Sequence, residues 1–241
     1  MESASYRESH QGKGDDYQTF CESNSYARLL WRLESRALTH VVQSLPAALR
    51  TTYLDFASGT GRILAHLSPH FKIATAVDVS EQMLGVGRRR VPTADFVHAD
   101  ITRDSEAARG PFDVVTAFRF FLNAEPSLRL DAMRAITARM HQDSVFIFNN
   151  HRNRGSLTHR LLLSLGKSDK DLHYMPHSDV TALLFECGLR IRTTFHFGVL
   201  PATEQRALLP SVLSYPLERA AAAIPLMAKA ANDIVYVTQR A

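Results

Sequence analysis

Apolar and polar positions along the chain predict a first helix followed by a regular alternation of strands and helices. From Tyr26 to Leu45 the apolar residues recur at helical spacing until Pro46 stops the pattern. Short apolar runs then predict strands at 51–56, 72–78, 94–98, 112–118 and 144–149. The stretches between them predict helices at 60–68, 80–89 and 127–140. Strands that alternate with helices form crossover units, so a parallel sheet is expected.

The pattern changes after residue 150. Helices are predicted near 156–165, at 179–187 before Gly188, and in the alanine-rich stretch 211–231. The last strands are predicted at 189–197 and 233–238, and their long connection fits an antiparallel strand on an otherwise parallel sheet. The predicted fold class is therefore α/β, with a seven-stranded, mostly parallel sheet, helices on both faces and one antiparallel edge strand.

Composition and charge narrow the function classes. A chain of 241 residues, 45% hydrophobic and 22% charged, suits one soluble globular domain. The net charge of +4 is mildly basic, and the run Arg88-Arg89-Arg90 predicts a solvated helix end rather than a nucleic-acid contact. Two distant cysteines, Cys21 and Cys187, argue against a disulfide framework and a zinc cluster.

No targeting or membrane segment is predicted. No apolar run approaches the ~20 residues that cross a bilayer. The segment Met1 to Gln18 lacks the apolar core of a secretory signal. A cytoplasmic protein is therefore expected.

The most informative segment is the turn after the first predicted strand. It joins a strand ending in Asp55 to the small-residue sequence Ala57-Ser58-Gly59-Thr60-Gly61 and then to a helix. Glycines let the backbone approach a ligand closely, and the next helix directs unpaired N–H groups toward it. A nucleotide-like cofactor is therefore predicted. Asp78 ends the second strand, where a carboxylate can accept from ribose hydroxyls, and Asp100 follows the third, where one can accept from an exocyclic amine.

In this order, the features resemble the class I S-adenosylmethionine-dependent methyltransferases. The match is carried by the Asp55–Gly61 loop, by Asp78 and Asp100, and by the strand Phe112-Asp113-Val114-Val115, with Ala57 replacing the first glycine of the family loop. The resemblance implies a Rossmann-like fold and S-adenosyl-L-methionine as the cofactor. It assigns the cofactor's methionine part to Ala57, Gly59 and Gly61, its amino group to Asp55, its ribose to Asp78, and its adenine to Val79, Met83, Asp100 and Ile101. Phe118 and Tyr26 complete the expected cofactor site.

The expected organisation is a disordered tail at 1–16 and a single methyltransferase domain at 17–241. Within the domain we expect a helical lid at 17–46, a cofactor-binding half at 51–150 and a substrate-side half at 151–241. Tyr17, Phe20 and Tyr26 either cover the cofactor, as this region often does in the family, or form a hydrophobic staple of the first helix. Arg36 on that helix is a candidate for the cofactor carboxylate.

Other interpretations of the turn remain. A nicotinamide-dependent dehydrogenase expects Gly-X-Gly-X-X-Gly, but the position three beyond Gly61 is Leu64, and Ala57 replaces the first glycine of the loop. The Lys-Ser/Thr pair of a phosphate-binding P-loop is also missing. Asp55 and Asp78 could each simply cap a turn or a helix, since Asp is common there.

The acceptor is expected beyond the fourth and fifth strands, at the carboxyl edge of the sheet. His151 is the candidate general base, because its unperturbed pKa lies near neutrality. Arg119 and Asn123 are the other candidate catalytic residues. Arg152 and Arg154 could bind an anion, Asn150 could orient a hydroxyl, and His173, His177 and His196 could line the pocket. Each of these residues could instead be a solvated or capping side chain.

The spacing of the histidines and cysteines predicts no metal site. The expected function is therefore methyl transfer from S-adenosyl-L-methionine to a small-molecule or glycan-like acceptor. The nearby arginines would suit an anionic acceptor, and O-methylation is favoured. The alternatives are N-methylation of an amino sugar or other small amine, and a non-catalytic cofactor-binding or regulatory protein. No nucleic-acid partner is expected.

Overall fold

The computed structural model describes residues 24–151, 153, 164, 175–200 and 210–241. Its central sheet has the strand order β3-β2-β1-β4-β5-β7-β6. The strands are β1 Thr52–Phe56, β2 Ile73–Asp78, β3 Asp95–His98, β4 Phe112–Ala117, β5 Met140–His151, β6 Leu189–Phe197 and β7 Asp233–Arg240. Strands β1 to β5 pair in parallel, which confirms the predicted mostly parallel, seven-stranded sheet.

The antiparallel strand is β7, and it lies one place in from the edge. It pairs antiparallel with β5 on one side and with the edge strand β6 on the other. The last strand of the chain is therefore inserted between two earlier ones. The antiparallel pairing was predicted, but not which strand would lie at the edge.

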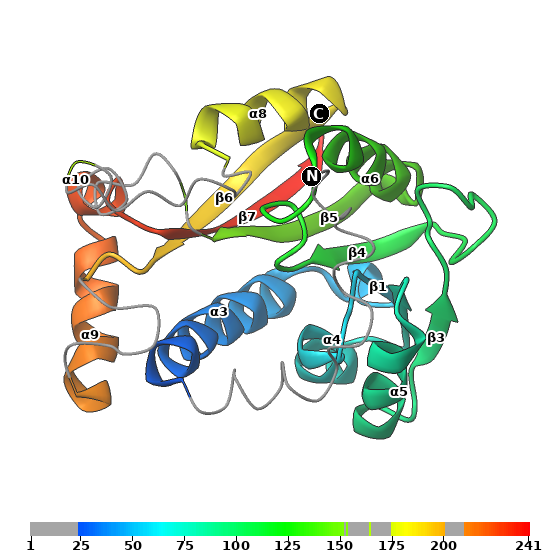
Figure 1. Cartoon of the computed structure of the whole chain (residues 1–241), viewed down its shortest axis with the longest axis horizontal. Helices are drawn as coiled ribbons and strands as arrows, with labels where there is room; N and C mark the ends of the chain where they lie inside the picture. The colour runs from blue at the N-terminus through cyan, green and yellow to red at the C-terminus, as the bar shows by residue number, and fades with distance from the viewer. Residues whose placement is uncertain (1–23, 152, 154–163, 165–174, 201–209) are drawn as a thin grey trace, which may run out of the picture.

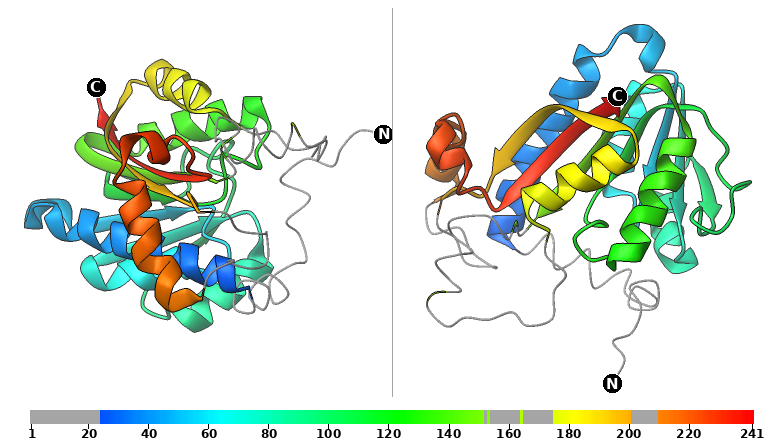
Figure 2. Two further views of the ribbon diagram at one scale, coloured as in Figure 1. Left: turned by 90° about the vertical axis from the view of Figure 1, so that its left-hand side faces the viewer. Right: turned by 90° about the horizontal axis from the view of Figure 1, so that it is seen from above.

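Helices cover both faces of the sheet (Figures 1 and 2). On one face lie α3 Ser25–Ser44, α4 Arg62–Leu67, α5 Glu81–Arg90 and α9 Ser211–Ala222. On the other lie α6 Pro126–Ala138 and α8 His177–Glu186. The shorter helices are η1 Ala47–Leu49, η2 Ser68–His70 and α10 Pro225–Ala228.

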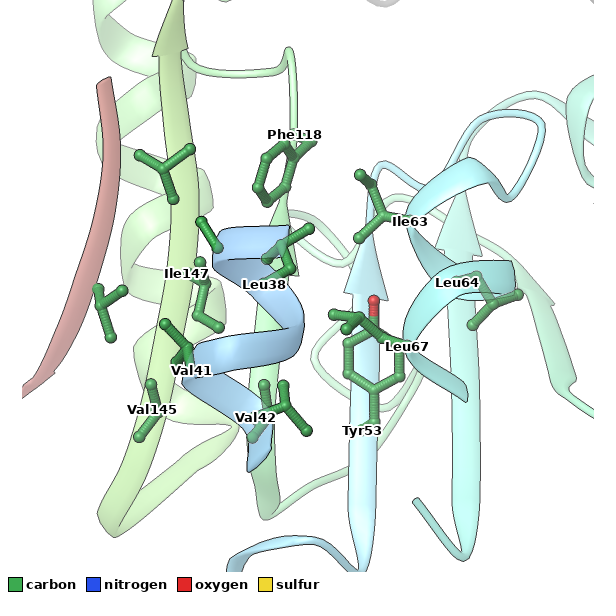
Figure 3. Close-up of a cluster of buried hydrophobic side chains, with 14 of the residues drawn as sticks. Leu38, Val41, Val42, Tyr53, Ile63, Leu64, Leu67, Phe118, Val145 and Ile147 are labelled. Atoms are coloured by element: carbon green, nitrogen blue, oxygen red, sulfur yellow. The ribbon is translucent and has the colours of Figure 1, made fainter. Parts of the chain in front are cut away.

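Each face of the sheet has its own hydrophobic core. The first is formed by the apolar stripe of α3, including Leu38 and Val42, against Tyr53, Val145 and other sheet residues (Figure 3). In Figure 3, Phe118 and Ile63 lie at the end of this cluster toward the strand tips. The second core packs α6 and α8 on the alternate residues of the same strands. The buried apolar runs of β1 and β4 follow from this arrangement, since both faces are covered.

The predicted helix 211–231 is two helices in the structure. α9 ends at Ala222 and α10 begins at Pro225. Pro225 is the first residue of α10, a position that suits proline because the N–H it lacks would have no partner within the helix there. The predicted tail 1–16 and the helix near 156–165 fall outside the described residues, apart from the single residue Ser164.

Candidate functional site

A cavity of about 240 Å³ lies at the carboxyl edge of the parallel strands. Its walls come from the segments that follow β1, β2, β3, β4 and β5. Because β1 lies between β2 and β4, the chain order reverses there, and open α/β sheets bind ligands at such a reversal. Twelve of the predicted site residues line the cavity, namely Asp55, Ala57, Gly59, Asp78, Val79, Met83, Asp100, Ile101, Phe118, Arg119, Asn123 and His151.

The turn after β1 alternates left-handed residues with ordinary ones. Ala57, Gly59 and Gly61 have φ of 51°, 54° and 72°. A Cβ on Gly61 would lie 3.3 Å from the Cα of Gly87 in α5, so the turn packs backbone against backbone there. Ala57 adopts the conformation that favours glycine, at a cost of about 1 kcal/mol. The substitution of the first glycine therefore preserves the shape of the turn.

Asp55 is a buried carboxyl group at the bottom of this turn. Its Oδ1 accepts from the hydroxyl of Thr116 at 2.7 Å, and its Oδ2 accepts from the N–H of Leu64 at 3.1 Å. Burial raises its pKa to about 7, although Thr116, Leu64 and the nearby Arg62 oppose that shift. A cationic group entering the cavity would stabilise the ionised form of Asp55.

Asp78 holds the tip of β2 and the turn together. Its Oδ2 accepts from the N–H of Gly59 at 2.8 Å, and its Oδ1 accepts from the N–H of Ser80 at 2.9 Å. Asp78 also lines the cavity, so the residue that caps this turn stands where the predicted ribose-binding residue is expected.

The next wall combines apolar and polar groups. Met83 follows the N-cap Ser80, whose Oγ accepts from the Met83 N–H at 3.4 Å, and the side chain of Met83 is buried. Oδ1 of Asp100 accepts from the N–H and the hydroxyl of Thr102, at 3.0 and 2.6 Å, and this closes a turn around Ile101. A flat apolar ring with polar edges suits such a wall.

Arg119 forms a second strained turn, on the opposite wall after β4. Its φ is 60°, which is unusual for a non-glycine residue and often marks a functional site. Its N–H donates to Oδ1 of Asn149 at 2.7 Å, and its carbonyl accepts from Nδ2 of Asn123 at 2.6 Å. Two side-chain amides therefore fix this turn beside His151, which lines the same cavity.

Three residues that matter here were not predicted from the sequence. Arg62 lines the cavity at the start of α4. Buried Glu34 of α3 accepts from Nδ2 of Asn149 at 3.2 Å, and its Oε2 lies 3.7 Å from a guanidinium nitrogen of Arg62. The available signal was an acid inside the apolar stripe of α3, one turn from Leu30 and from Leu38.

Some predicted residues lie elsewhere. The hydroxyl of Tyr26 lies against Gly198, where a Cβ would come within 2.5 Å of it, and Tyr26 does not line the cavity. Burial and the nearby Asp233 raise its pKa well above the usual value. Arg36 donates to the hydroxyl of Tyr215 at 2.5 Å, which places it at α9 instead of at a cofactor carboxylate. Gly61 shapes the turn without lining the cavity.

The other candidate residues for the acceptor side also lie away from the cavity or outside the described residues. Nδ2 of Asn150 donates to the carbonyl of Met175 on the opposite face of the sheet. His177 contacts the hydroxyl of Tyr236, and His196 contacts Thr194, away from the cavity. Strand alternation explains the position of Asn150, because neighbouring residues of β5 face opposite sides of the sheet. Tyr17, Phe20, Arg152, Arg154 and His173 lie outside the described residues.

Metal-binding clusters and membrane-spanning helices are both missing from the described residues. Among them, no group of three or more His, Cys, Asp and Glu side chains is placed to hold a metal ion. No helix in the same part of the chain is long and apolar enough to cross a membrane.

Comparison with known proteins points to one family. Residues 54–142 match the family model of a methyltransferase domain. The chain is 31% identical over 139 residues to a dTDP-3-amino-3,6-dideoxy-alpha-D-glucopyranose N,N-dimethyltransferase of Streptomyces fradiae, an alignment covering 57% of this chain and 48% of the relative. It is 43% identical over 84 residues to a demethylmenaquinone methyltransferase of Clavibacter sepedonicus, covering 33% and 34%. The chain thus matches about half or less of these relatives.

Solved structures share the whole fold. The magnesium protoporphyrin IX methyltransferase from Synechocystis PCC 6803 with bound SAH has a TM-score of 0.65, at 14% identity, covering 98% of this chain and 97% of that one. An S-adenosylmethionine-dependent methyltransferase from Clostridium acetobutylicum ATCC 824 has a TM-score of 0.62, at 16% identity, covering 94% and 99%. At such identities the likeness concerns the fold.

Proposed function

We propose that this chain, which belongs to the class I S-adenosylmethionine-dependent methyltransferases, binds S-adenosyl-L-methionine and methylates a small-molecule or glycan-like acceptor. The observation that carries the proposal is the cavity wall on which the turn 57–61, Asp55, Asp78 and Asp100 meet. The cavity has the groups that each part of this cofactor needs. Asp55 suits an ammonium group, Asp78 a ribose diol, and the turn at Asp100 the edge of an adenine ring.

The cofactor would supply an electrophilic methyl group carried on a sulfonium. The chain's own task is then to hold a nucleophile in line and to keep water away from it. Phe118, Phe120 and Leu128 give the cavity an apolar wall on the side of β4 and α6. These side chains would exclude water around the acceptor.

His151 is the proposed general base. It lies at the end of β5, lines the cavity, and faces the same side of the sheet as Asn149. A neutral imidazole can take the proton that a hydroxyl must lose on methylation. Arg119 and Asn123, held together by their backbone-to-side-chain bond, would orient the acceptor. These roles favour O-methylation.

N-methylation of an amino sugar is the second candidate. It is supported by the likeness to the Streptomyces fradiae N,N-dimethyltransferase, whose name specifies a 3-amino sugar carried on dTDP. The same base could deprotonate an ammonium group before transfer. A guanidinium such as that of Arg119 would suit an anionic part of either acceptor.

Calorimetric titration with S-adenosylhomocysteine and with NAD tests the cofactor. We expect binding of the first and none of the second, and the reverse would refute the proposal. Turnover is then followed as S-adenosylhomocysteine formation with a panel of hydroxyl and amine acceptors, including dTDP-amino sugars. If no acceptor is methylated by a protein that binds the cofactor, a regulatory role would replace the enzymatic one.

A further inference from the structure

Exposed apolar side chains gather on α9 and α10, two helices that contact each other. Seven large apolar side chains are exposed among the described residues, and five of them lie here, namely Leu213, Leu217, Ile224, Leu226 and Met227. Leu213 and Leu217 are one turn apart and share a face of α9, and Leu226 on α10 is 70% exposed. Scattered exposed apolar residues need no explanation, but a contiguous group of them marks an interaction surface.

Basic side chains surround this apolar group. α3 packs beside α9, and the guanidinium carbons of Arg32 and Arg36 lie 4.2 and 4.8 Å from the ring centroid of Tyr215. Both arginines are exposed, and so are Arg219 on α9 and Lys229 at the end of α10. The apolar group therefore has a basic border on the sides formed by α3, α9 and α10.

The acids of the same helices point inward. Glu34 of α3 is 1% exposed and Glu218 of α9 is 2% exposed. The two carboxylate oxygens of Glu218 accept from the N–H groups of Val199 and Leu200, at 3.1 and 2.8 Å. Every exposed charged side chain that the structure describes on α3, α9 and α10 is consequently basic. A surface of this kind attracts an anionic partner.

This surface stands at the same edge of the sheet as the cavity. After α10 the chain enters β7, whose first residue Asp233 pairs with His151 at the end of β5. His151 lines the cavity. Figure 1 shows α9 and α10 beyond this end of the sheet, with the start of α3 beside α9. A partner on this surface would therefore lie on the side of the molecule where the parallel strands end.

An apolar centre with a basic border matches an anionic lipid surface. Apolar side chains of such a helix enter the headgroup region, while Lys and Arg side chains attract the anionic lipids. A nucleic acid would leave the apolar centre unmatched, because protein–nucleic acid interfaces are polar. A second copy of the chain in a two-fold dimer would place the two basic borders against each other.

We propose that the surface formed by α9, α10 and the exposed arginines of α3 docks on an anionic lipid bilayer. Leu213, Leu217 and Leu226 enter the headgroup region, and Arg219 and Lys229 contact the anionic headgroups. The binding is peripheral, because the apolar side chains come from one face of short helices. It does not depend on the proposed methyl transfer, so it can be tested on the full chain without cofactor.

Co-sedimentation with lipid vesicles tests the proposal. The full chain is mixed with vesicles of phosphatidylcholine alone and of an equimolar mixture of phosphatidylcholine and phosphatidylglycerol. We expect at least about tenfold tighter binding to the mixed vesicles, and a loss of that preference in high salt. Binding to neither vesicle, or equal binding to both, would overturn the proposal.

A pair of variants at exposed apolar positions locates the contact. Leu226→Glu should weaken binding to the mixed vesicles by about 10- to 100-fold, because it removes apolar contact and adds a charge of the same sign as the lipid. Phe185→Glu is the matched control, since Phe185 is 86% exposed on α8 at the opposite face of the sheet. The control should bind as the parent does, and equal losses in both variants would refute the assigned surface. Both positions are exposed, so denaturant unfolding should show a fold as stable as the parent's.

A second pair separates the basic border from net charge. Arg219→Gln combined with Lys229→Gln should weaken binding to the mixed vesicles by about 10- to 30-fold. Arg134→Gln combined with Arg190→Gln removes the same charge from exposed positions on α6 and β6 and should change binding by less than about twofold. The same loss in both double variants would show attraction by net charge alone and would overturn the proposal.

Light scattering of the parent without lipid tests the remaining occupant. We expect a monomer whose mass Leu226→Glu does not change. A dimer that Leu226→Glu dissociates would assign the apolar surface to a second copy of the chain, and the lipid proposal would then be wrong.

Discussion

Replacing Asp55 by asparagine should make the protein more stable at neutral pH and less able to bind its cofactor. The carboxyl group is 1% exposed, and its pKa rises from 3.8 to about 7 because burial disfavours the ionised form. The folded state therefore holds a proton that the unfolded state has released between these two values. The contribution of Asp55 to stability is fully present below pH 3.8 and is lost as the pH rises to about 7.

The size of the effect follows from the two pKa values. The rise from 3.8 to about 7 is worth about 4 kcal/mol, or about 1.4 kcal/mol for each pH unit in this window. The amide side chain of the Asp55→Asn variant cannot ionise, so the variant does not lose this stability as the pH rises. Its amide, however, satisfies the Thr116 hydroxyl and the Leu64 N–H less well, at a cost of about 1–2 kcal/mol. The variant should thus be about 2–3 kcal/mol more stable than the parent above pH 7, with the advantage gone near pH 5.

Denaturant unfolding at a series of pH values between about 4 and 8 measures this. The difference in unfolding free energy between the Asp55→Asn variant and the parent should grow with pH and level off above about 7. A difference that is constant over the range would refute the reasoning, because an ordinary pKa for Asp55 would then be required. The same residue should couple binding to protons, since a cofactor ammonium favours the ionised carboxylate. S-adenosylhomocysteine should therefore bind the parent more weakly at about pH 6 than at about pH 8, and the Asp55→Asn variant weakly at both.

Further predictions concern the other walls of the cavity. Asp78→Ala should weaken S-adenosylhomocysteine binding, which calorimetry measures. It should also lower the free energy of unfolding by about 1–3 kcal/mol in denaturant experiments, because the N–H groups of Gly59 and Ser80 lose their acceptor. His151→Ala should lower turnover by about 10²- to 10⁴-fold and leave cofactor affinity intact, and an unchanged rate would remove it as the base. Ala57→Gly should change the unfolding free energy in denaturant by less than about 1 kcal/mol, because relief of the left-handed φ offsets the added freedom of the unfolded chain.

The cofactor half of the fold follows closely from the sequence. The predicted strands 51–56, 72–78 and 112–118 differ from β1, β2 and β4 by a residue at most at each end. These strands are buried on both faces, so their apolar runs end where the turns begin. The polar residues just beyond the runs must then meet at one edge of the sheet. That is why Asp78 and Asp100 could be assigned to one cavity before any geometry was known.

Other parts of the chain are harder to predict because their signals are not local. The irregular stretch 101–110 is a specific structure fixed from a distance. Arg139, at the end of α6, donates to the carbonyls of Asp104, Ser105, Ala107 and Ala108. The sequence does not indicate which loop carbonyls a buried arginine at the end of a helix will bind. The insertion of β7 between β5 and β6 is likewise set by pairing across the sheet rather than by the hydrophobic pattern.

The link from Glu34 through Asn149 to Arg119 shows what such distant pairing does for the site. Glu34 and Asn149 are 115 positions apart, and Asn149 lies 30 positions from Arg119, so no spacing rule connects them. Yet Glu34 touches both sides of the cavity, with Arg62 beside the cofactor turn and, through Asn149, the strained turn at Arg119. One buried side chain of α3 is therefore linked to two cavity-lining residues, Arg62 after β1 and Arg119 after β4.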